Sequence, residues 1–370
     1  MTQASHTTKS SFTQPLFDCD VHELMLDATQ LRPWLKQPWR DWVGHWTGLY
    51  RSPLYVHPLL SSAGQEVANS VAAGASSGIR GVDFERFREE HLDYYNIRHA
   101  VLTGFFYVGV MRSQPEFSIA LASAYNDWLV EHWLSKDPRL LGSITITPQE
   151  PEAAAREIDR MGKHPQMVQI LLPLTDVAYG EPRYHPIYAA CERNDLRVAF
   201  HQSHWTATPV GLTMRRNIEW HSSFSLAFMA QLISVIFEGV MDKYPRLRFI
   251  MLEGGYTWLP HMLRRLDQHY KELRVEVPWV KRLPSETIRE HFRFGSHPTE
   301  GLSARELAMV FDLCGSEDLV CFASDYPHWD GDEPAFAFPS GLPPELLNKL
   351  MLTNALDFYG LSGETDADRA

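Results

Sequence analysis

Short apolar runs, rich in β-branched and aromatic residues, recur along the chain with room for a helix between most of them. Eight of these runs predict β-strands. They cover residues 16–23, 99–106, 140–147, 167–174, 197–202, 248–254, 292–297 and 319–325. Because the runs are apolar almost without interruption, each strand should be buried on both faces, as in a parallel sheet covered by helices.

Helix-like stretches separate most of these strands, for example PEAAAREIDRMG and GLSARELAMVFDLCG. Eight such units predict a (β/α)8 TIM-type barrel. A doubly wound sheet is the main alternative, but no GxGxxG turn follows the first predicted strand. We therefore expect one barrel domain over residues 16–360, a disordered N-terminus over 1–15 and a polar tail over 361–370.

A long interruption at residues 24–98 separates the first two predicted strands. It holds four tryptophans within thirteen residues: Trp34, Trp39, Trp42 and Trp46. Long loops that interrupt a regular fold often carry function, so we expect this insertion to form a lid or one wall of a substrate pocket. The alternatives are a helical subdomain that buries its own tryptophans, or a contact between two copies of the chain.

Composition narrows the class of partner. The chain has 370 residues, 44% of them hydrophobic, and a net charge of −12. This charge argues against nucleic acid or an anionic membrane as the main partner, and no apolar run is long enough to predict a transmembrane helix. The four cysteines are widely spaced, as is typical of reduced core residues, so we expect a cytoplasmic protein that acts on a small molecule.

Side chains suited to metal binding follow five of the predicted strands. In a (β/α)8 barrel the chemistry lies at the carboxyl ends of the strands. Those ends carry Asp20, His22, Glu23, His201, His204, Glu253, His297, Asp325 and His328. Imidazole and carboxylate groups are ligands of Zn²⁺, Mn²⁺ and Fe²⁺, so their shared location favours a site for a divalent metal.

Each of these residues also has a structural interpretation. Asp20 and His22 should share one face of the first strand, whereas alternation directs Glu23 away from them. Asp325 could instead cap the turn after its strand. The three histidines His204, His297 and His328 could be additional ligands, hydrogen-bonding partners of the ligands, or pocket lining.

Six segments carry a resemblance to a known family. They are DCDVHE, AFHQSH, EGGYTWLPHMLRRLD, FRFGSHPTE, FASDYPHWDGD and TNALDFYG, which occur in this order between residue 16 and about residue 360. Together they resemble the amidohydrolase superfamily, in particular the branch related to aminocarboxymuconate-semialdehyde decarboxylase and the aromatic-acid decarboxylases. No single segment is decisive, but six in order make a specific signal.

The resemblance implies a barrel that carries a divalent metal (Zn, Mn or Fe) at its mouth, held by Asp20, His22, His201 and Asp325. It also implies a homodimer. Pro260, Arg265 and Asp267 follow the pattern of the family's helix after the sixth strand. One residue departs from the family, because Glu253 stands where hydrolytic and decarboxylating relatives generally carry a histidine.

Three interpretations of Glu253 remain open from the sequence. It could act as general acid or base in place of the histidine, which predicts a metal-dependent hydrolase or non-oxidative decarboxylase of a small aromatic or apolar organic acid. It could instead bind a second metal, which predicts a di-iron oxygenase on the same barrel. It could also be structural and pair with Arg248 or Arg293, or the barrel could be a non-catalytic binding protein. Family resemblance favours the first of these, with one metal ion, whereas the carboxylate-rich local chemistry favours a second ion.

Overall fold

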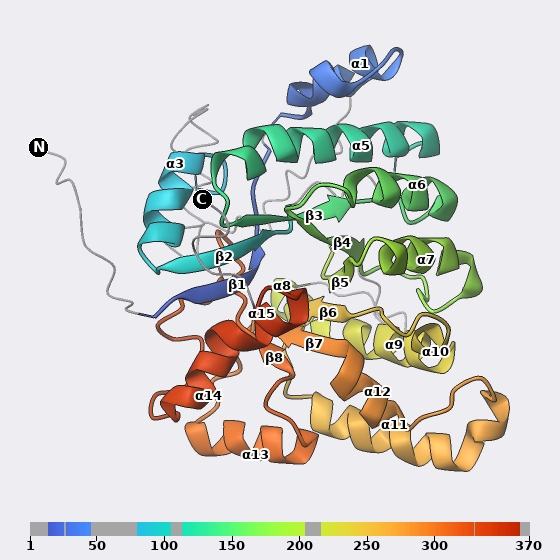
Figure 1. The fold of residues 1–370 in the computed structure, drawn as a ribbon, viewed down its shortest axis with the longest axis vertical. Coiled ribbons are helices and arrows are strands. Elements are labelled where there is room, and N and C mark those ends of the chain that lie inside the picture. The colour runs from blue at the N-terminus through green and yellow to red at the C-terminus, as the bar shows by residue number, and fades with distance from the viewer. Residues whose placement is uncertain are drawn as a thin grey trace, which may run out of the picture.

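The computed structural model describes residues 14–25, 27–45, 80–104, 113–203, 216–328 and 330–362. Within them, eight parallel strands follow one another around a barrel in the order β1 to β8 (Figure 1). The strands are β1 (Leu16–Val21), β2 (Ile97–Leu102), β3 (Leu140–Thr145), β4 (Met167–Pro173), β5 (Arg197–His201), β6 (Phe249–Leu252), β7 (Phe292–Gly295) and β8 (Val320–Cys321). All eight predicted strands are confirmed, although each ends earlier than its apolar run.

Backbone hydrogen bonds between β1 and the residues around β8 join the first strand to the last. The amide of Cys19 donates to the carbonyl of Phe322 at 3.0 Å, and the amide of Asp325 donates to the carbonyl of Asp20 at 3.0 Å. A parallel bridge also joins Val21 to Tyr326. The predicted (β/α)8 barrel is therefore confirmed, and the doubly wound alternative is excluded.

Within the described residues, seven longer helices cover the outside of the barrel: α5 (Pro115–His132), α6 (Pro151–Met161), α7 (His185–Arg193), α9 (Phe224–Phe237), α11 (Leu259–Leu273), α12 (Pro284–His291) and α13 (Ala304–Cys314). Local sequence explains their ends. A proline occupies the first turn of α5, α6, α7, α11 and α12. At α13, Ser303 and Glu306 form a capping box, and Gly315 ends the helix in the left-handed conformation at φ 69°.

The remaining helices are short. They are α1 (Trp39–Trp42), α3 (Phe84–Phe87), α8 (Asn217–His221), α10 (Val240–Lys243), α14 (Pro344–Asn348), α15 (Asn354–Tyr359), the 3-10 turns η1 (Ala28–Trp34), η2 (Val43–His45), η4 (Leu134–Lys136), η5 (Pro182–Tyr184) and η6 (Arg274–Glu276), and the π-helical turns η3 (Arg88–Asp93) and η7 (Lys349–Thr353). The described ends of the 24–98 insertion thus fold into short helices. Its role as a lid stays a prediction.

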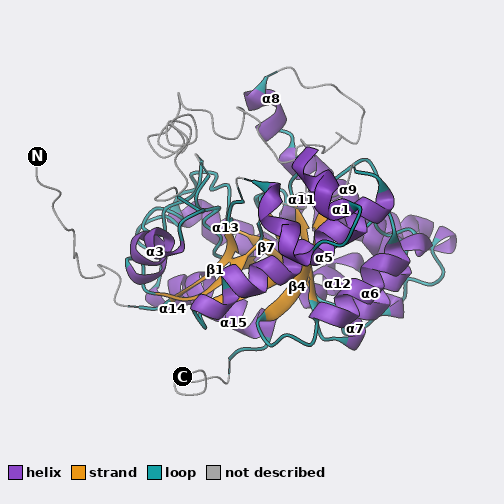
Figure 2. Ribbon diagram, turned by 90° about the horizontal axis from the view of Figure 1, so that it is seen from above, coloured by secondary structure: helices purple, strands orange, loops and turns teal. Residues whose placement is uncertain are grey.

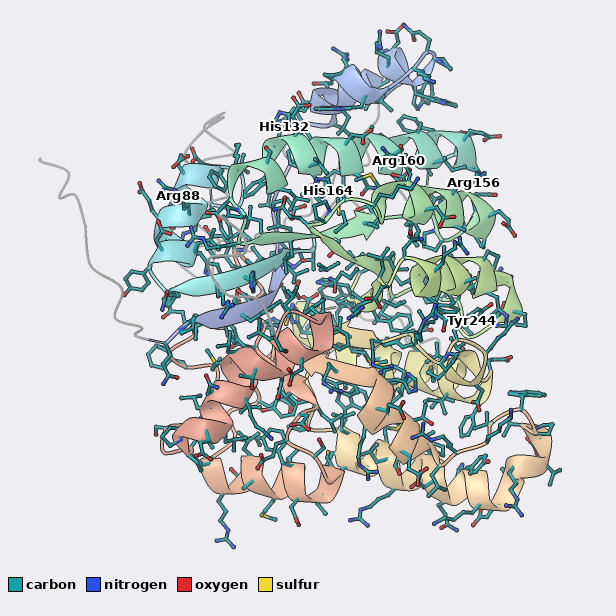
Figure 3. The ribbon with its side chains drawn as sticks, in the orientation of Figure 1. Arg88, His132, Arg156, Arg160, His164 and Tyr244 are labelled. Atoms are coloured by element: carbon teal, nitrogen blue, oxygen red, sulfur yellow. The ribbon has the colours of Figure 1, made fainter. Side chains whose placement is uncertain are left out.

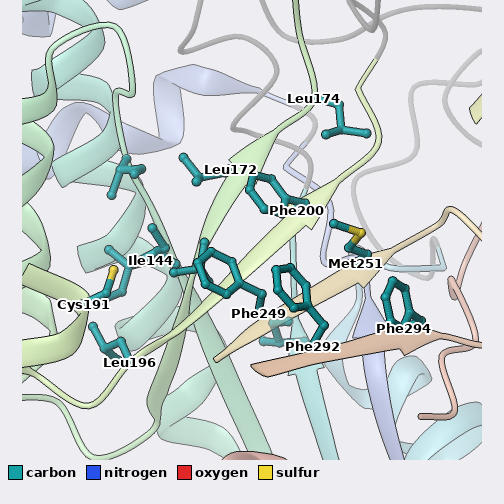
Figure 4. Close-up of a cluster of buried hydrophobic side chains, with 14 of the residues drawn as sticks. Ile144, Leu172, Leu174, Cys191, Leu196, Phe200, Phe249, Met251, Phe292 and Phe294 are labelled. Carbon is teal, nitrogen blue, oxygen red and sulfur yellow. The ribbon is translucent and has the colours of Figure 1, made fainter. Parts of the chain in front are cut away.

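Two apolar layers hold the barrel together. The outer layer lies between strands and helices, where the stacked rings of Phe200, Phe249 and Phe292 are conspicuous (Figure 4). The inner layer fills the barrel with small and branched side chains and continues into α15. There the ring of Tyr359 stacks on that of Phe17 with centroids 5.3 Å apart. Helix α15 therefore closes the amino end of the barrel.

The two ends of the barrel differ in what covers them and in which residues lie there. Figure 2 shows α8, which follows β5, above the barrel and α15 below it. Charged side chains lie on the outer helices, among them Arg156 and Arg160 (Figure 3). Because all eight strands are parallel, the polar residues that follow them converge at the end opposite α15, where the chemistry of such barrels takes place.

The sequence-based expectation that no apolar run is long enough to span a membrane is wrong. The run from Ile218 to Phe237 is, by length and mean hydropathy, apolar enough to cross a membrane, although no such run was expected. Of its most apolar window, 44% is buried inside the protein. Core helices of soluble proteins can have the same length and hydropathy, and α9 packs Phe228 and Leu232 into the outer layer. The run is therefore weak evidence for a membrane span.

Candidate metal centre

Four predicted ligands meet at the carboxyl end of the barrel. From β1, the Oδ1 atom of Asp20 lies 3.5 Å from Nε2 of His22. From β5, Nε2 of His201 lies 3.2 Å from Oδ2 of Asp20. Beyond β8, Oδ1 of Asp325 lies 2.9 Å from Nε2 of His22. All four residues are buried, and Asp20, His22 and His201 present ligand atoms within 4.8 Å of one another.

The histidines are oriented by acceptors behind them. Nδ1 of His22 lies 2.6 Å from the carbonyl oxygen of Gly104, and Nδ1 of His201 lies 2.8 Å from that of Gln202. Because a carbonyl can only accept a hydrogen bond, each Nδ1 carries the proton, and the Nε2 atoms face Asp20. This arrangement is typical of histidines that bind a metal through Nε2.

A second group adjoins the first and shares Asp325. It consists of Glu253, His297 and Asp325, whose ligand atoms also lie within 4.8 Å of one another. Nε2 of His297 is 3.4 Å from Oδ2 of Asp325, while its Nδ1 donates to Oδ2 of Asp332 at 2.9 Å. His297 therefore shows the same orientation as His22 and His201, with Nε2 facing the centre.

Glu253 follows β6 directly, and its Oε2 lies 3.7 Å from Nδ1 of His201. Burial and the negative charge of Asp325 raise the pKa of the Glu253 carboxyl well above its ordinary value, and His201 offsets part of this effect. The suggested pairing with Arg248 or Arg293 is wrong. Both arginines line a pocket with Phe358 of α15, at the opposite end of the barrel.

Glu253 and Asp325 share an unusual backbone conformation. Their φ angles are 66° and 59°, in the left-handed region that residues other than glycine rarely adopt. Such a conformation costs about 1–3 kcal/mol per residue and persists where the surroundings enforce it, most often at functional sites. The turn redirects both carboxylates as the strands end, which explains how they reach the centre.

The donor set fits a divalent cation. Asp20, Glu253 and Asp325 place three carboxylates in a fully buried region. Within the described part of the chain, Oδ2 of Asp20 and Oδ2 of Asp325 accept no hydrogen bond. Burying such groups without a compensating positive charge is costly. Burial alone would lower the pKa of His22, but the negative charges of Asp20 and Asp325 raise it to about 9. The electrostatic environment of this region therefore favours a positive charge.

Several residues that hold the predicted ligands in place were not predicted from the sequence. Thr103, just after β2, donates from Oγ1 to Oδ1 of Asp20 at 2.6 Å. Asp332 anchors His297, as described above, and also accepts from Thr299. Asp330 lies beside the same histidine, with Oδ2 4.0 Å from its Nε2. Asp330 and Asp332 follow a predicted ligand within FASDYPHWDGD, a signal that could have pointed to them.

A buried network around Asp18 links β1 to β8. Its Oδ1 accepts from the amide of Ser324 at 2.9 Å, and its Oδ2 accepts from the hydroxyl of Ser324 at 2.5 Å and from Nε2 of His91 at 2.8 Å. Since Asp18 and Ser324 stand next to the ligand-bearing segments, this network positions Asp20 and Asp325. An acidic residue inside an apolar strand was the available signal.

Of the remaining predicted site residues, one lies with the candidate ligands and one does not. His328 donates from Nδ1 to Oδ1 of Asp325 at 2.7 Å and belongs to a third group with His22. Glu23 lies beyond Val21, the last residue of β1. Its buried side chain accepts a hydrogen bond from the hydroxyl of Tyr125 at 2.5 Å. It is in none of the three groups of metal-ligating side chains found among the described residues. His204 lies outside the described residues.

Two of the four tryptophans of the insertion, Trp34 and Trp39, contact helix α5. Trp34 packs its ring against His132 with centroids 5.6 Å apart, and Trp39 packs against Phe117 at 5.3 Å. Trp42 is 54% exposed, and Trp46 lies outside the described residues. The contacts of Trp34 and Trp39 fit the alternative of a helical subdomain, and the substrate-pocket role of the four tryptophans stays a prediction.

The sequence matches a known family over most of its length. The profile of the amidohydrolase family covers residues 71–361, so this chain belongs to the amidohydrolase family. Among characterised proteins, the gamma-resorcylate decarboxylase of Rhodococcus jostii (strain RHA1) is 26% identical over 273 residues, which are 67% of this chain and 78% of the relative.

Solved structures give the same fold. The 2,6-dihydroxybenzoate decarboxylase from Rhizobium aligns with a TM-score of 0.69 at 18% identity, over 95% of this chain and 100% of that one. The 5-carboxyvanillate decarboxylase of Novosphingobium aromaticivorans, solved with manganese and 4-hydroxy-3-methoxy-5-nitrobenzoic acid, aligns with a TM-score of 0.69 at 20% identity, over 94% of this chain and 97% of that one.

Proposed function

We propose that this protein is a metal-dependent, non-oxidative decarboxylase of a hydroxylated aromatic acid, within the broader class of metal-dependent hydrolases and carboxy-lyases predicted from the sequence. The observation that carries the proposal is the buried convergence of Asp20, His22, His201 and Asp325 beside Glu253. The decarboxylase relatives favour this reaction over hydrolysis and over the di-iron oxygenase.

Asp20, His22, His201 and Asp325 would hold one divalent cation, with His297 within reach of the same carboxylate. When bound, such a cation neutralises and orients the carboxylate and hydroxyl oxygens of an aromatic acid. We propose manganese, the metal found in the carboxyvanillate and dihydroxybenzoate relatives. Zinc and iron suit the same nitrogen and oxygen donors and are the alternatives that metal analysis distinguishes.

Glu253 would act as the proton donor. Decarboxylation of an aromatic acid requires a proton at the ring carbon that carries the carboxylate. The Glu253 carboxyl transfers its proton to that carbon, the carbon–carbon bond to the carboxylate breaks, its electron pair returns to the ring, and CO₂ leaves. The Glu253 carboxylate then takes up a proton from the solvent, so each turnover consumes one proton. Full burial favours the protonated form that this step needs.

The surrounding residues would keep this geometry rigid. Thr103 fixes the carboxylate of Asp20, and Asp332 fixes the ring of His297. A centre held by hydrogen-bonded partners does not reorganise during the reaction, which is the condition for effective electrostatic stabilisation. We further propose that the enzyme works on a free small molecule, in the cytoplasm, as a homodimer.

The test is to purify the protein without chelators, load it with Mn²⁺ and incubate it with 2,6-dihydroxybenzoate or 5-carboxyvanillate. We expect release of CO₂ and the matching phenol from at least one of these acids, without uptake of oxygen. Oxygen uptake with a hydroxylated product and about two irons per chain would establish the oxygenase instead. No turnover of a panel of hydroxybenzoates by metal-loaded protein would contradict the proposal.

A further inference from the structure

A pocket of about 330 Å³ lies at the amino end of the barrel, opposite the metal centre. It is lined by Asp195, Arg197, Pro245, Arg246, Arg248, Arg293, Asp357 and Phe358. Four of these eight residues are arginines, in a protein whose net charge is −12. This concentration of positive charge is unrelated to the chemistry proposed for the other end of the barrel.

Three of the arginines come from consecutive strands and share the inward-facing position. Arg197 begins β5, Arg248 immediately precedes β6, and Arg293 is the second residue of β7. Their neighbours along the chain, Val198, Phe249 and Phe292, belong to the outer apolar layer. Because side chains alternate along a strand, the arginines point toward the barrel axis. They form the wall of the pocket that faces α15.

The hydrogen bonds of these arginines leave much of their donor capacity unused. Arg248 donates from Nη1 to the carbonyl of Leu247, and Arg293 donates from Nη1 to the carbonyls of Arg289 and Phe292. A guanidinium has five N–H donors. Nε of Arg293 is buried without a hydrogen-bond partner among the described residues. Arg197 is engaged further, since its Nε donates to the carbonyl of Phe358 at 2.8 Å.

Few negative charges balance the pocket. Arg197 pairs with Asp195 at 3.0 Å, and Asp195 has an 85% exposed side chain. Within the part of the chain that the structure describes, the guanidinium groups of Arg246, Arg248 and Arg293 form no ion pair with a carboxylate within 4.0 Å. Two carboxylates lie nearby, since Asp357 also lines the pocket and Glu192 accepts from the backbone amide of Arg246 at 3.0 Å. Glu290 acts on Arg248 from farther away and is paired with Arg282 at 2.5 Å. Burial, together with Arg197 and Arg293, lowers the pKa of Arg248, as expected where like charges crowd.

We propose that this pocket binds a small phosphate-bearing anion through Arg246, Arg248 and Arg293. Planar guanidinium groups bind phosphate oxygens in pairs of parallel hydrogen bonds, and the pocket has the volume of a small-ligand site. The ligand neutralises the excess positive charge and bridges the starts of β6 and β7 to the end of α15. Nucleic acid does not fit, because the protein as a whole is acidic, with a net charge of −12.

The alternative is that the arginines are structural and serve only to satisfy backbone carbonyls. The two interpretations differ in what happens when an anion is added. A binding site makes the protein more stable in proportion to ligand concentration, whereas satisfied backbone partners leave stability unchanged once ionic strength is held constant. The active site at the other end of the barrel provides an independent check that each variant is folded.

The experiment is a calorimetric titration of the metal-loaded full chain with sodium pyrophosphate, at constant ionic strength, with orthophosphate and citrate in parallel. Because pyrophosphate also binds Mn²⁺, the titration is repeated on the chain without metal, where this complex cannot form. We expect one saturable site per chain, with pyrophosphate bound more tightly than citrate. Arg293→Gln and Arg248→Gln should each weaken binding at least about tenfold, since each removes a charge-assisted contact.

Arg246→Gln is the second test, because Arg246 is exposed and its loss leaves the strands intact. It should weaken pyrophosphate binding while circular dichroism and turnover stay unchanged. The matched control is Arg264→Gln on the exposed face of α11, which should bind as the wild type does. No saturable binding at millimolar pyrophosphate, or equal affinity in all four variants, would overturn the proposal. Tighter binding of citrate than of pyrophosphate would also overturn the assignment to phosphate.

Discussion

Nε2 of His22 lies 2.9 Å from Oδ1 of Asp325, which joins the first strand of the barrel to the segment that follows the last. The two residues are 303 positions apart in sequence and meet only because the barrel closes. The contact also identifies the part of the site where loss of one residue affects all the others, since Asp325 belongs to two of the three candidate ligand groups.

We expect His201→Ala and Asp325→Asn to lose bound metal and turnover while remaining folded. Each substitution removes a ligand atom from a centre that needs every carboxylate and imidazole it has. Metal content by mass spectrometry and turnover are the measurements, with circular dichroism to check the fold. The control is His269→Ala, an exposed histidine on α11. Full metal content and turnover in both ligand variants would rule out the proposed centre.

Glu253→Gln should keep its metal and lose about 10²- to 10⁴-fold in kcat, the range associated with general acid catalysis. The amide preserves the shape of the side chain but has no proton to deliver. Glu272→Gln, on the exposed part of α11, serves as the control. Loss of part of the metal in Glu253→Gln would make this residue a ligand and revive the two-metal interpretation. Unchanged metal and turnover would make it structural.

Asp18→Asn should lower the free energy of unfolding by about 1–3 kcal/mol, because the neutral amide leaves buried donors of Ser324 and His91 poorly paired. Chemical denaturation of the metal-loaded protein measures the change. If Asp18 positions the metal ligands, its substitution should also weaken metal binding. The variant His91→Gln, alone and combined with Asp18→Asn, should give non-additive losses. Additive losses would show that the two residues act separately.

Removing the metal with a chelator should abolish turnover and lower the thermal midpoint, and Mn²⁺ should restore both. The physical reason is that the buried carboxylates of Asp20, Glu253 and Asp325 repel one another when no cation is present, whereas a ligand that binds only the folded state stabilises it. Differential scanning fluorimetry with and without Mn²⁺ measures the shift. An unchanged midpoint on chelation would argue against a structural contribution of the cation.

Trp39→Ala distinguishes the two interpretations of the insertion. Because Trp39 packs against Phe117 of α5, we expect a loss of stability of about 1–3 kcal/mol with little change in KM. Thermal denaturation and initial rates at several substrate concentrations are the measurements. A KM raised severalfold at unchanged stability would instead place Trp39 at the substrate, as the sequence-based prediction of a pocket wall requires.

The sequence alone predicted the barrel and most of the residues that converge at its carboxyl end. Continuous apolar runs predict parallel strands, and proline and capping residues mark the helices between them, so the eight strands could be found by local pattern. Ligand-type residues at the strand ends were visible for the same reason. Asp20, His22, His201 and Asp325 lie where the fold requires the site to be, and they come together in the structure.

Only the tertiary structure decided which polar residues meet. The alternation of side chains along a strand could not predict the direction of Glu23, because β1 ends at Val21 and Glu23 lies outside the strand. Nor could it show that Arg248 and Glu253, at either end of β6, face opposite ends of the barrel. Asp18, Thr103 and Asp332 act on ligands from other strands and loops. Closure of the barrel creates these contacts across long sequence separations, and a local pattern carries no information about them.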